Sequence, residues 1–333
     1  MNTRERFQAV MNFQPVDRLP MIEWAGWWDK TYDRWLAEGL PADMDFHDSH
    51  RYFGLDVHYQ YWPMAYRPDG DAELMATPVA CDADYEALLP SLYPETILTD
   101  TWKHTLTEHL AVQQSGEAFM WYTLEGFFWY PRRLMGIEPH MLAFYDQPEL
   151  LHRINEDLCE WLIGVVGELQ AFGVEADFVT FAEDLSYNHG PMLSRASFEE
   201  FLTPYYRRVL PAVKKTDTLA LIDTDGLVND ALPWFVDAGL DGILPLERQA
   251  GVDLAQLRRE FPDLRFIGHY NKMVMKHGRE AMRAEFERLL PIARQGGYIM
   301  SVDHQTPPDV SLANYRIYME LFAEYAALAA KGD

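Results

Sequence analysis

The clearest indication of the fold is the stretch Gly296-Gly297-Tyr298-Ile299-Met300-Ser301-Val302-Asp303-His304-Gln305-Thr306-Pro307-Pro308-Asp309-Val310. Its two glycines are expected to end a helix, and the apolar residues 298–302 to form a buried strand. Asp303 and His304 follow at the carboxyl end of that strand, before the start of a new helix. A strand followed by a polar loop and a helix is typical of a parallel α/β unit, and such loops carry the chemistry. Asp303 and His304 therefore lie where an active site is expected.

The same unit recurs through the second half of the chain. Each of five predicted strands is followed by a predicted helix, and the strands recur at roughly 30-residue intervals, over 177–182, 218–222, 242–246, 264–268 and 297–302. One of the helices is predicted to be capped by Ser197, with Glu200 completing a capping box. This rhythm predicts a parallel sheet of the kind found in α/β barrels.

The first half of the chain follows the same plan less regularly. Strands are expected over 19–24, 53–61 and 117–126. Residues 103–112 alternate between apolar and polar side chains, so they could pair with the last of these strands as a hairpin or a sheet extension. The Pro- and Asp-rich segment 62–94 is expected to be an inserted loop, which could cover the open end of the barrel.

No linker or shift in composition divides the chain. Its eight expected strands predict an α/β fold, a (β/α)8 TIM barrel, that forms a single domain over residues 1–333 with an elaborated N-terminal half. A hydrophobic content of 48% is enough for a large core.

Composition narrows the function classes. The chain has 52 acidic residues against 28 lysines and arginines, a formal charge of −24, so neither nucleic acid nor an anionic membrane surface is an expected partner. Two cysteines outside any CxxC spacing argue against a disulfide framework and a thiolate zinc finger, and they suit a reducing cytoplasm. There is no apolar run of the length that a membrane helix needs. A cytoplasmic protein that acts on a small molecule is expected.

Three parts of the sequence resemble the uroporphyrinogen decarboxylase superfamily. They are the opening residues 3–20, the middle residues 135–150, and residues 239–246 together with 297–314. The resemblance covers essentially the whole chain and implies a TIM barrel with its site at the carboxyl ends of the strands. The superfamily holds two chemistries. One is decarboxylation of the acetate groups of uroporphyrinogen without a cofactor, and the other is methyl transfer to or from a corrinoid, with zinc activating the thiol or methyl donor.

The chain departs from the decarboxylase pattern at two places. Decarboxylases carry an Arg-Gln-Ala-Gly-Arg motif after the first strand, whereas residues 20–28 here read PMIEWAGWW. They also carry an Asp in a Phe-Ser-Asp-Ile motif near the second strand, and residues 56–62 here read DVHYQYW without an equivalent Asp. A polycarboxylate substrate needs cations in its pocket. An acidic and aromatic mouth supplies the opposite, so the methyltransferase branch is favoured.

In the methyltransferase branch, a His-x-Cys pair after the fifth strand and a Cys after the eighth hold zinc. The matching positions here are Asp223, Asp225 and His304, which can bind a metal but include no thiolate. Such an oxygen-rich set would bind zinc more weakly, or would suit manganese or iron. Glu183, at another strand end, is a candidate fourth ligand. Alternatively, Asp225 could cap the helix expected from Leu227, with Asp223 helping the turn.

Further candidates lie at predicted strand ends. Glu183, Asp225 and His304 are expected to be the catalytic acid and base groups. Residues expected to contact the substrate, each of which could instead belong to the core or to a loop, are Glu23, Trp24, His58, Tyr59, Glu125, Glu247, His269 and Asn271. The N-terminal half is rich in aromatic residues, which suit a methoxylated aromatic compound, a quaternary amine or the face of a corrinoid.

These features predict a metal-assisted methyltransferase that acts with a corrinoid on a small methyl donor. Zinc is the first expectation for the divalent metal, with manganese or iron as alternatives. The corrinoid is expected on a separate partner protein, because the chain has no Asp-x-His-x-x-Gly motif. The resemblance also implies a homodimer. Two alternatives stay open, which are a cofactor-free decarboxylase or lyase of a small carboxylate and a non-catalytic barrel that binds an aromatic ligand.

Overall fold

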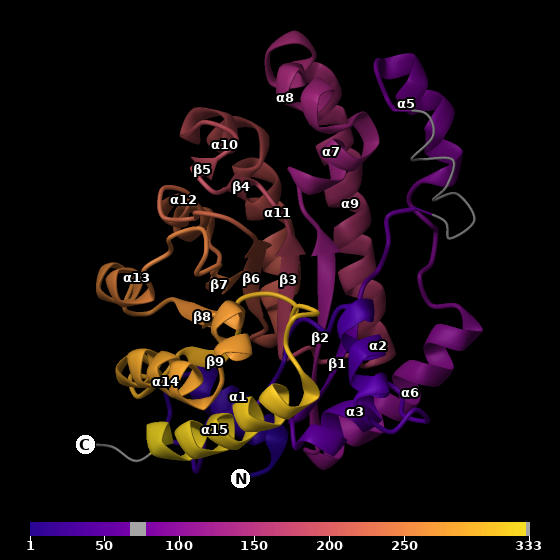
Figure 1. The fold of residues 1–333 in the computed structure, drawn as a ribbon. Coiled ribbons are helices and arrows are strands. Elements are labelled where there is room, and N and C mark those ends of the chain that lie inside the picture. Colours follow the sequence, from indigo (N-terminus) through magenta and orange to yellow (C-terminus); the bar gives the residue numbers. More distant parts are fainter. Residues whose placement is uncertain (67–77, 331–333) are drawn as a thin grey trace.

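Seven parallel strands form one curled sheet in the computed structural model, which describes residues 1–66 and 78–330 (Figure 1). In sheet order the strands are β1 (Val57–Tyr61), β2 (Ala118–Glu125), β3 (Phe178–Ala182), β6 (Leu219–Thr224), β7 (Gly242–Pro245), β8 (Arg265–Tyr270) and β9 (Tyr298–Val302). Neighbours in the sheet also follow one another along the chain, apart from a two-stranded antiparallel ribbon of β4 (Ser186–Tyr187) and β5 (Gly190–Pro191). The predicted α/β class is confirmed.

The segment predicted as the first strand, 19–24, is not a regular strand, but it lies where an eighth strand would lie. On one side, the backbone N–H of Asp56 donates to the carbonyl of Met21 (2.7 Å), just before β1. On the other side, the indole N–H of Trp24 donates to the carbonyl of Val302 (2.9 Å) at the end of β9. The segment therefore joins the two edge strands and closes the sheet into a barrel without a regular ladder.

Helices lie between successive strands and on the outer face of the sheet (Figure 1). Their bounds are α1 (Thr3–Met11), α2 (Asp29–Ala37), α3 (Phe46–Phe53), α5 (Asp82–Leu88), α6 (Asp100–Ser115), α7 (Trp129–Met135), α8 (Ile137–Asp146), α9 (Pro148–Phe172), α10 (Arg195–Phe201), α11 (Thr203–Val213), α12 (Leu232–Ala238), α13 (Leu254–Glu260), α14 (Arg279–Ala293) and α15 (Leu312–Ala330), with 3-10 turns η1 (Leu89–Ser91), η2 (Lys214–Thr216) and η3 (Lys272–His277). Across residues 1–66 and 78–330, none of them is long and apolar enough to cross a membrane.

Helix α1 covers the amino-terminal end of the barrel. The ring of Phe7 stacks on Phe119 and Phe178, at centroid distances of 4.2 and 5.3 Å, near the starts of β2 and β3. The backbone N–H of Gly297, just before β9, donates to the carbonyl of Val10 (2.8 Å). Full burial of a side chain such as Phe7 stabilises the fold by about 1.5–3 kcal/mol. With this end covered, the carboxyl end of the barrel is the one available to a ligand.

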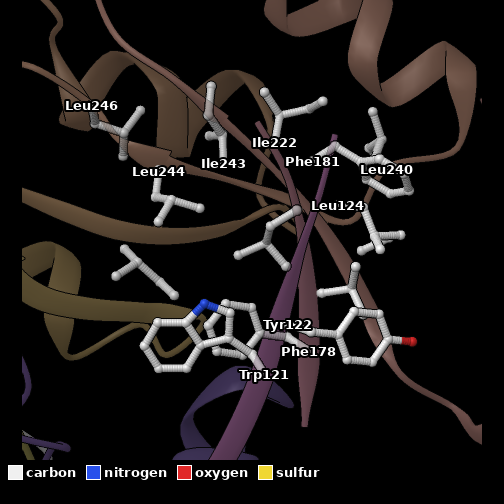
Figure 2. Packing of buried hydrophobic residues seen from close by; sticks show 14 of the residues in the cluster. Trp121, Tyr122, Leu124, Phe178, Phe181, Ile222, Leu240, Ile243, Leu244 and Leu246 are labelled. Atoms are coloured by element: carbon white, nitrogen blue, oxygen red, sulfur yellow. The ribbon is translucent and has the colours of Figure 1, made fainter. Parts of the chain in front are cut away.

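The core continues from α1 into the barrel. Trp121 and Phe178 stack side by side at 4.9 Å (Figure 2). Residues from β6 and β7, among them Ile222 and Leu244, fill the space above them in the same view. All four of these side chains are almost completely buried, so the lower part of the barrel is packed and does not form a pore.

One sequence prediction in the first half is corrected. Residues 103–112 lie in α6 and form no hairpin with β2. Thr99 caps this helix by accepting from the N–H of Trp102, and Gly116 ends it in the left-handed conformation. Leu106 and Leu110 are buried at helical spacing, so packing of one helix face outweighed the short polar–apolar alternation.

Other predicted element boundaries also differ from those in the structure. The helix predicted to be capped by Ser197 is capped three residues earlier by Ser194, whose side chain accepts from the N–H of Ser197. The expected loop 62–94 contains α5 and η1 in its described part. Its residues 67–77 lie outside the described residues, so a lid over the barrel stays a prediction. That residues 1–333 form a single domain also stays a prediction.

Candidate active site

A pocket of about 170 Å³ opens at the carboxyl end of the barrel. Its lining residues follow the segment 19–23 and the strands β1, β2, β3, β6 and β9, and they are Trp24, Trp62, Trp129, Ala182, Asp184, Asp223, Asp225 and His304. A larger hollow of about 550 Å³ lies between α3 and α15, away from the strand ends. The smaller pocket is the candidate site, because it lies at the end of the barrel where α/β barrels hold their active sites.

The register of two strands explains which acids reach the pocket. Ala182 of β3 is paired with Asp223 of β6, and both line the pocket. Side chains alternate between the two faces of a strand, so residues two positions further on point the same way. Asp184 and Asp225 occupy those positions and also line the pocket. Glu183, between Ala182 and Asp184, points to the other side.

Glu183 is buried and acts as an anchor for the loop after β2. Its carboxylate accepts from the backbone N–H groups of Phe127 (2.9 Å), Phe128 (2.7 Å) and Trp129 (3.1 Å), and from the hydroxyl of Tyr206. Burial raises the pKa of Glu183 to about 7, although these hydrogen bonds lower it. The structure does not bring Glu183 to the pocket, because both of its oxygens are occupied by a turn that positions Trp129.

Asp225 and His304 lie close together in the pocket. Asp225 Oδ2 lies 3.7 Å from His304 Nε2, and the two side chains are 36% and 31% exposed, so a ligand can reach both. Trp24 stands edge-on to the imidazole, with ring centroids 6.0 Å apart. Since α12 begins only at Leu232, with Ala231 as its cap, Asp225 does not cap that helix. The alternative structural role for Asp225 is therefore ruled out.

Burial and neighbouring carboxylates raise the pKa of Asp225 to about 7. Burial contributes most, Glu247 and Asp184 add to it, and Lys272 opposes it. Burial also lowers the pKa of His304, and Lys272 lowers it further. At neutral pH Asp225 can therefore either accept or release a proton, as a general acid or base requires.

Asp223 lies deeper in the same pocket. Burial raises its pKa well above the usual range, and the carboxylates of Asp184 and Asp225 raise it further. Within the described part of the chain it accepts no hydrogen bond and pairs with no cation. By accessible surface Asp223 is half-buried. The neighbouring acids disfavour its ionised form, so a ligand that supplied a positive charge here would be stabilised.

Two nearby cations are already paired. Lys272 Nζ lies 3.2 Å from Asp303 Oδ1 and 4.0 Å from Glu247 Oε1. Asp303 also accepts from the backbone N–H groups of Arg248 (3.1 Å) and Lys272 (3.2 Å), so it fixes the loops after β7 and β8.

Arg132 is the second cation. It donates to the Asp184 carbonyl (2.8 Å), lies 3.5 Å from Asp184 Oδ2 and stacks 4.4 Å from the ring of Trp129. Neither Arg132 nor Lys272 neutralises Asp223.

Glu247 and His269 support the pocket from outside. Glu247 accepts from the N–H of Gly226 (3.0 Å) and so fixes the loop that carries Asp225. His269 is buried, donates from Nδ1 to the Leu246 carbonyl (2.8 Å) and accepts from Arg288 at Nε2 (3.2 Å). Burial lowers its pKa to about 4, so it is neutral and held in place. Neither residue lines the pocket.

Asn271 and Glu125 also lie outside the pocket. The side chain of Asn271 accepts from the N–H of Met273 (3.0 Å) and caps η3. Glu125 is buried and lies 3.3 Å from Arg133 Nη1. Each is engaged in local structure, and neither is among the residues that line the pocket.

The remaining predicted contacts are buried near β1. His58 donates from Nε2 to the Glu23 carbonyl (3.0 Å), and Tyr59 stacks on His109 at 3.6 Å. The carboxyl group of Glu23 is fully buried beside Tyr315, whose hydroxyl lies 3.4 Å away, and burial raises its pKa to about 8. Of the eight predicted substrate contacts, the structure therefore brings Trp24 alone into the pocket wall.

The predicted metal set does not fit this arrangement. Within residues 1–66 and 78–330, no group of three or more His, Cys, Asp or Glu side chains is arranged to hold a metal ion. Asp225 and His304 are close enough to share an ion, but zinc in proteins usually takes four ligands. Glu183, the expected fourth ligand, faces away from Asp223. We therefore derive no step through a metal.

Four pocket residues were not among the predicted site residues, and they are Trp62, Trp129, Ala182 and Asp184. Trp62 directly follows β1, and Trp129 lies shortly after β2, so their positions after strand ends were a usable signal. For Asp184 the signal was the alternation of side chains along β3. Using that signal requires knowing that Ala182 faces the pocket, and the sequence alone does not show which face of β3 points inward.

Comparison with known proteins connects this geometry to a family. The family model described as uroporphyrinogen decarboxylase (URO-D) matches residues 128–325. The uroporphyrinogen decarboxylase of Anaeromyxobacter dehalogenans is 28% identical over 161 residues, which are 48% of this chain and 44% of that protein. The enzyme of Hydrogenobaculum sp. is 23% identical over 186 residues, 54% of this chain and 50% of that protein. The chain thus spans about half the length of the curated relatives it matches.

Solved structures extend the similarity over nearly the whole chain. A methyltransferase from Methanosarcina mazei superposes with a TM-score of 0.71 at 15% identity, covering 98% of this chain and 99% of that one. A candidate vitamin-B12 independent methionine synthase from Listeria monocytogenes gives a TM-score of 0.51 at 10% identity, covering 96% and 99%. Structural similarity at such low sequence identity establishes the α/β barrel. The chemistry has to be argued from the residues of the site.

Proposed function

Because this chain belongs to the uroporphyrinogen decarboxylase family, we propose that it is a methyltransferase that removes a methyl group from a small donor bound at the strand ends. The observation that carries the proposal is the lining of the pocket, which consists of three tryptophans, three aspartates, one histidine and one alanine. Such a wall suits a small neutral or cationic donor. The barrel shared with a methyltransferase supports the same choice.

The lining disfavours the decarboxylation of a polycarboxylate. Two like unit charges 4 Å apart near a protein surface repel by about 4 kcal/mol. A substrate with several carboxylates would meet Asp184, Asp223 and Asp225, while Arg132 and Lys272 are already paired with acids. The pocket offers no arginine fork of the kind that recognises carboxylates.

The residues of the pocket can position the donor and adjust the charge on its leaving atom. The indole rings of Trp24, Trp62 and Trp129 exclude water and limit the orientations of a small ligand. When a methyl group leaves oxygen, the electron pair of the broken bond stays on that oxygen, which then needs a proton. Asp225, with a pKa of about 7, can supply it, and His304 at 3.7 Å can take part in the same proton transfer.

The methyl acceptor in this proposal is a reduced corrinoid on a partner protein, which supplies a cobalt nucleophile. A pocket of about 170 Å³ holds a small donor but not a corrin macrocycle. The partner would therefore present its corrinoid at the mouth, beside Trp62, whose side chain is 38% exposed. A homodimer and a cytoplasmic location stay predictions.

Methyl transfer to free reduced cobalamin tests the proposal. The protein is mixed with a panel of small ethers and amines, and the growth of the methylcobalamin absorption is recorded. We expect turnover with at least one donor and, where that donor is an ether, its loss in Asp225→Asn. Asp230→Asn, the same change on an exposed residue of the same loop, should leave the rate unchanged. Release of carbon dioxide from small carboxylates, without methyl transfer, would instead establish a lyase.

A further inference from the structure

We infer that the pocket binds the methylated ammonium group of an organic cation, with the indole rings as its walls and the aspartates as its counter-charge. This inference names the class of methyl donor and in that respect rests on the proposed function. The binding of a cation is a separate property that can be measured without turnover. Both the shape and the charge of the pocket support it.

The first support is the convergence of three indole rings from three loops. Trp24, Trp62 and Trp129 all line a pocket of about 170 Å³. Two of them are held in place, because Trp24 donates its indole N–H to the Val302 carbonyl (2.9 Å) and Trp129 is fixed through its backbone by Glu183 (3.1 Å). Preorganised aromatic walls attract quaternary ammonium groups, and tryptophan is the strongest of them.

The second support is a pair of carboxyl groups without a cationic partner, whose ionised form a bound cation would favour. Asp223 accepts no hydrogen bond in the described part of the chain, and Asp225 pairs with nothing stronger than His304 at 3.7 Å. The nearby cations are committed elsewhere, Arg132 to Asp184 and Lys272 to Asp303. A cation entering the pocket would therefore find two carboxyl groups whose charge nothing else balances.

Other ligand classes fit less well. A metal ion would need three or more donors arranged around it, and the described residues provide no such group. An anion would be repelled by Asp184, Asp223 and Asp225. A neutral aromatic ligand could stack on the indoles but would leave the carboxyl group of Asp223 without a cationic partner. A methylated ammonium group suits both the indole rings and the aspartates, because its positive charge is spread over methyl groups that pack against aromatic rings.

Calorimetric titration with an isosteric pair of probes tests the inference. Choline chloride carries a trimethylammonium group, and 3,3-dimethylbutan-1-ol has the same shape without the charge. At pH 8 we expect choline to bind and the neutral alcohol to bind at least roughly tenfold more weakly, since a desolvated cation–π contact alone is of that size. Equal affinities, or no choline binding by folded protein, would overturn the inference.

Matched variants identify the groups responsible. Trp24→Leu and Asp223→Asn should each weaken choline binding roughly tenfold. Trp28→Leu and Asp230→Asn make the same changes at exposed positions, the first on the segment of Trp24 and the second on the loop after β6, and should leave the affinity unchanged. If Trp24→Leu does not fold, as judged by circular dichroism, Asp223→Asn decides alone. Unchanged choline affinity in folded Asp223→Asn would refute the assignment of the counter-charge.

The two proposals fail in different ways. Choline binding without methyl transfer to cobalamin from any donor would remove the proposed function and leave the cation site standing. Methyl transfer from a neutral ether by a protein that does not bind choline would do the reverse.

Discussion

Asp225 and His304 are far apart in the sequence, yet Asp225 Oδ2 and His304 Nε2 lie 3.7 Å apart in one pocket. Asp225 follows β6 and His304 follows β9, and closure of the sheet brings the two strand ends to the same rim. The pair is the only part of the predicted acid, base and metal set that the described residues bring within ion-pair distance.

Asp225→Asn should lower kcat for methyl transfer from an oxygen donor by about 100-fold, because the amide cannot supply the proton that the leaving oxygen needs. Stopped-flow absorbance of methylcobalamin measures the rate. Asp230→Asn, on the same loop but exposed, is the control. An Asp225→Asn rate within twofold of the wild-type rate would show that Asp225 is not the acid.

The affinity for choline should rise between pH 6 and pH 8. Asp225 has a pKa of about 7 in the free protein, and a bound cation favours its ionised form, so binding is coupled to loss of a proton. The charged groups that face Asp225 are Asp184, Asp223, Glu247, Lys272, Asp303 and His304.

Titrations in two buffers of different ionisation enthalpy give the number of protons released. A flat affinity across this range, or proton uptake, would contradict the prediction. In Asp225→Asn the pH dependence should be smaller.

Glu183→Gln should destabilise the fold by about 1–3 kcal/mol for each backbone N–H left without an acceptor. The amide nitrogen of glutamine cannot accept from Phe127, Phe128 or Trp129, which donate to the carboxylate now. Urea denaturation followed by circular dichroism measures the change. A variant as stable as the wild type but inactive would return Glu183 to the list of catalytic candidates.

Glu23→Gln should flatten the dependence of stability on pH between 6.5 and 8. Burial raises the pKa of Glu23 to about 8 in the folded protein, so below that pH the folded state holds a proton that the unfolded state has lost. Its stabilising contribution therefore falls as pH rises, by about 1.4 kcal/mol per pH unit. Denaturation midpoints at several pH values test this. Identical slopes in wild type and variant would mean that Glu23 is ionised in the fold.

Treatment with a chelator should leave choline binding within twofold, because the described donors do not assemble a metal site. Metal content is measured in parallel by mass spectrometry on the wild type and on the Asp225→Ala/His304→Ala double variant. Near-stoichiometric metal that is lost in the double variant would contradict this prediction and restore the metal-assisted mechanism.

Much of the fold could be predicted because its signals are local. Each of the last five strands is a short apolar run that ends in acids or polar residues, and the structure has β3, β6, β7, β8 and β9 at those places. The first half was harder, since a helix such as α6 carries only a few buried residues and its short alternation imitates a strand. The eighth strand position is filled by an irregular segment whose contacts come from distant parts of the chain.

The sequence by itself determined the chemical types at the rim of the barrel, because acids and aromatic residues directly follow the strands. Only the tertiary structure decided which of them share a pocket. The pairing of Ala182 with Asp223 sets which faces of β3 and β6 point inward, and this places Asp184 in the pocket and Glu183 outside it. That choice depends on register between strands, and register is fixed by packing across the barrel and not by any residue's immediate neighbours in the chain.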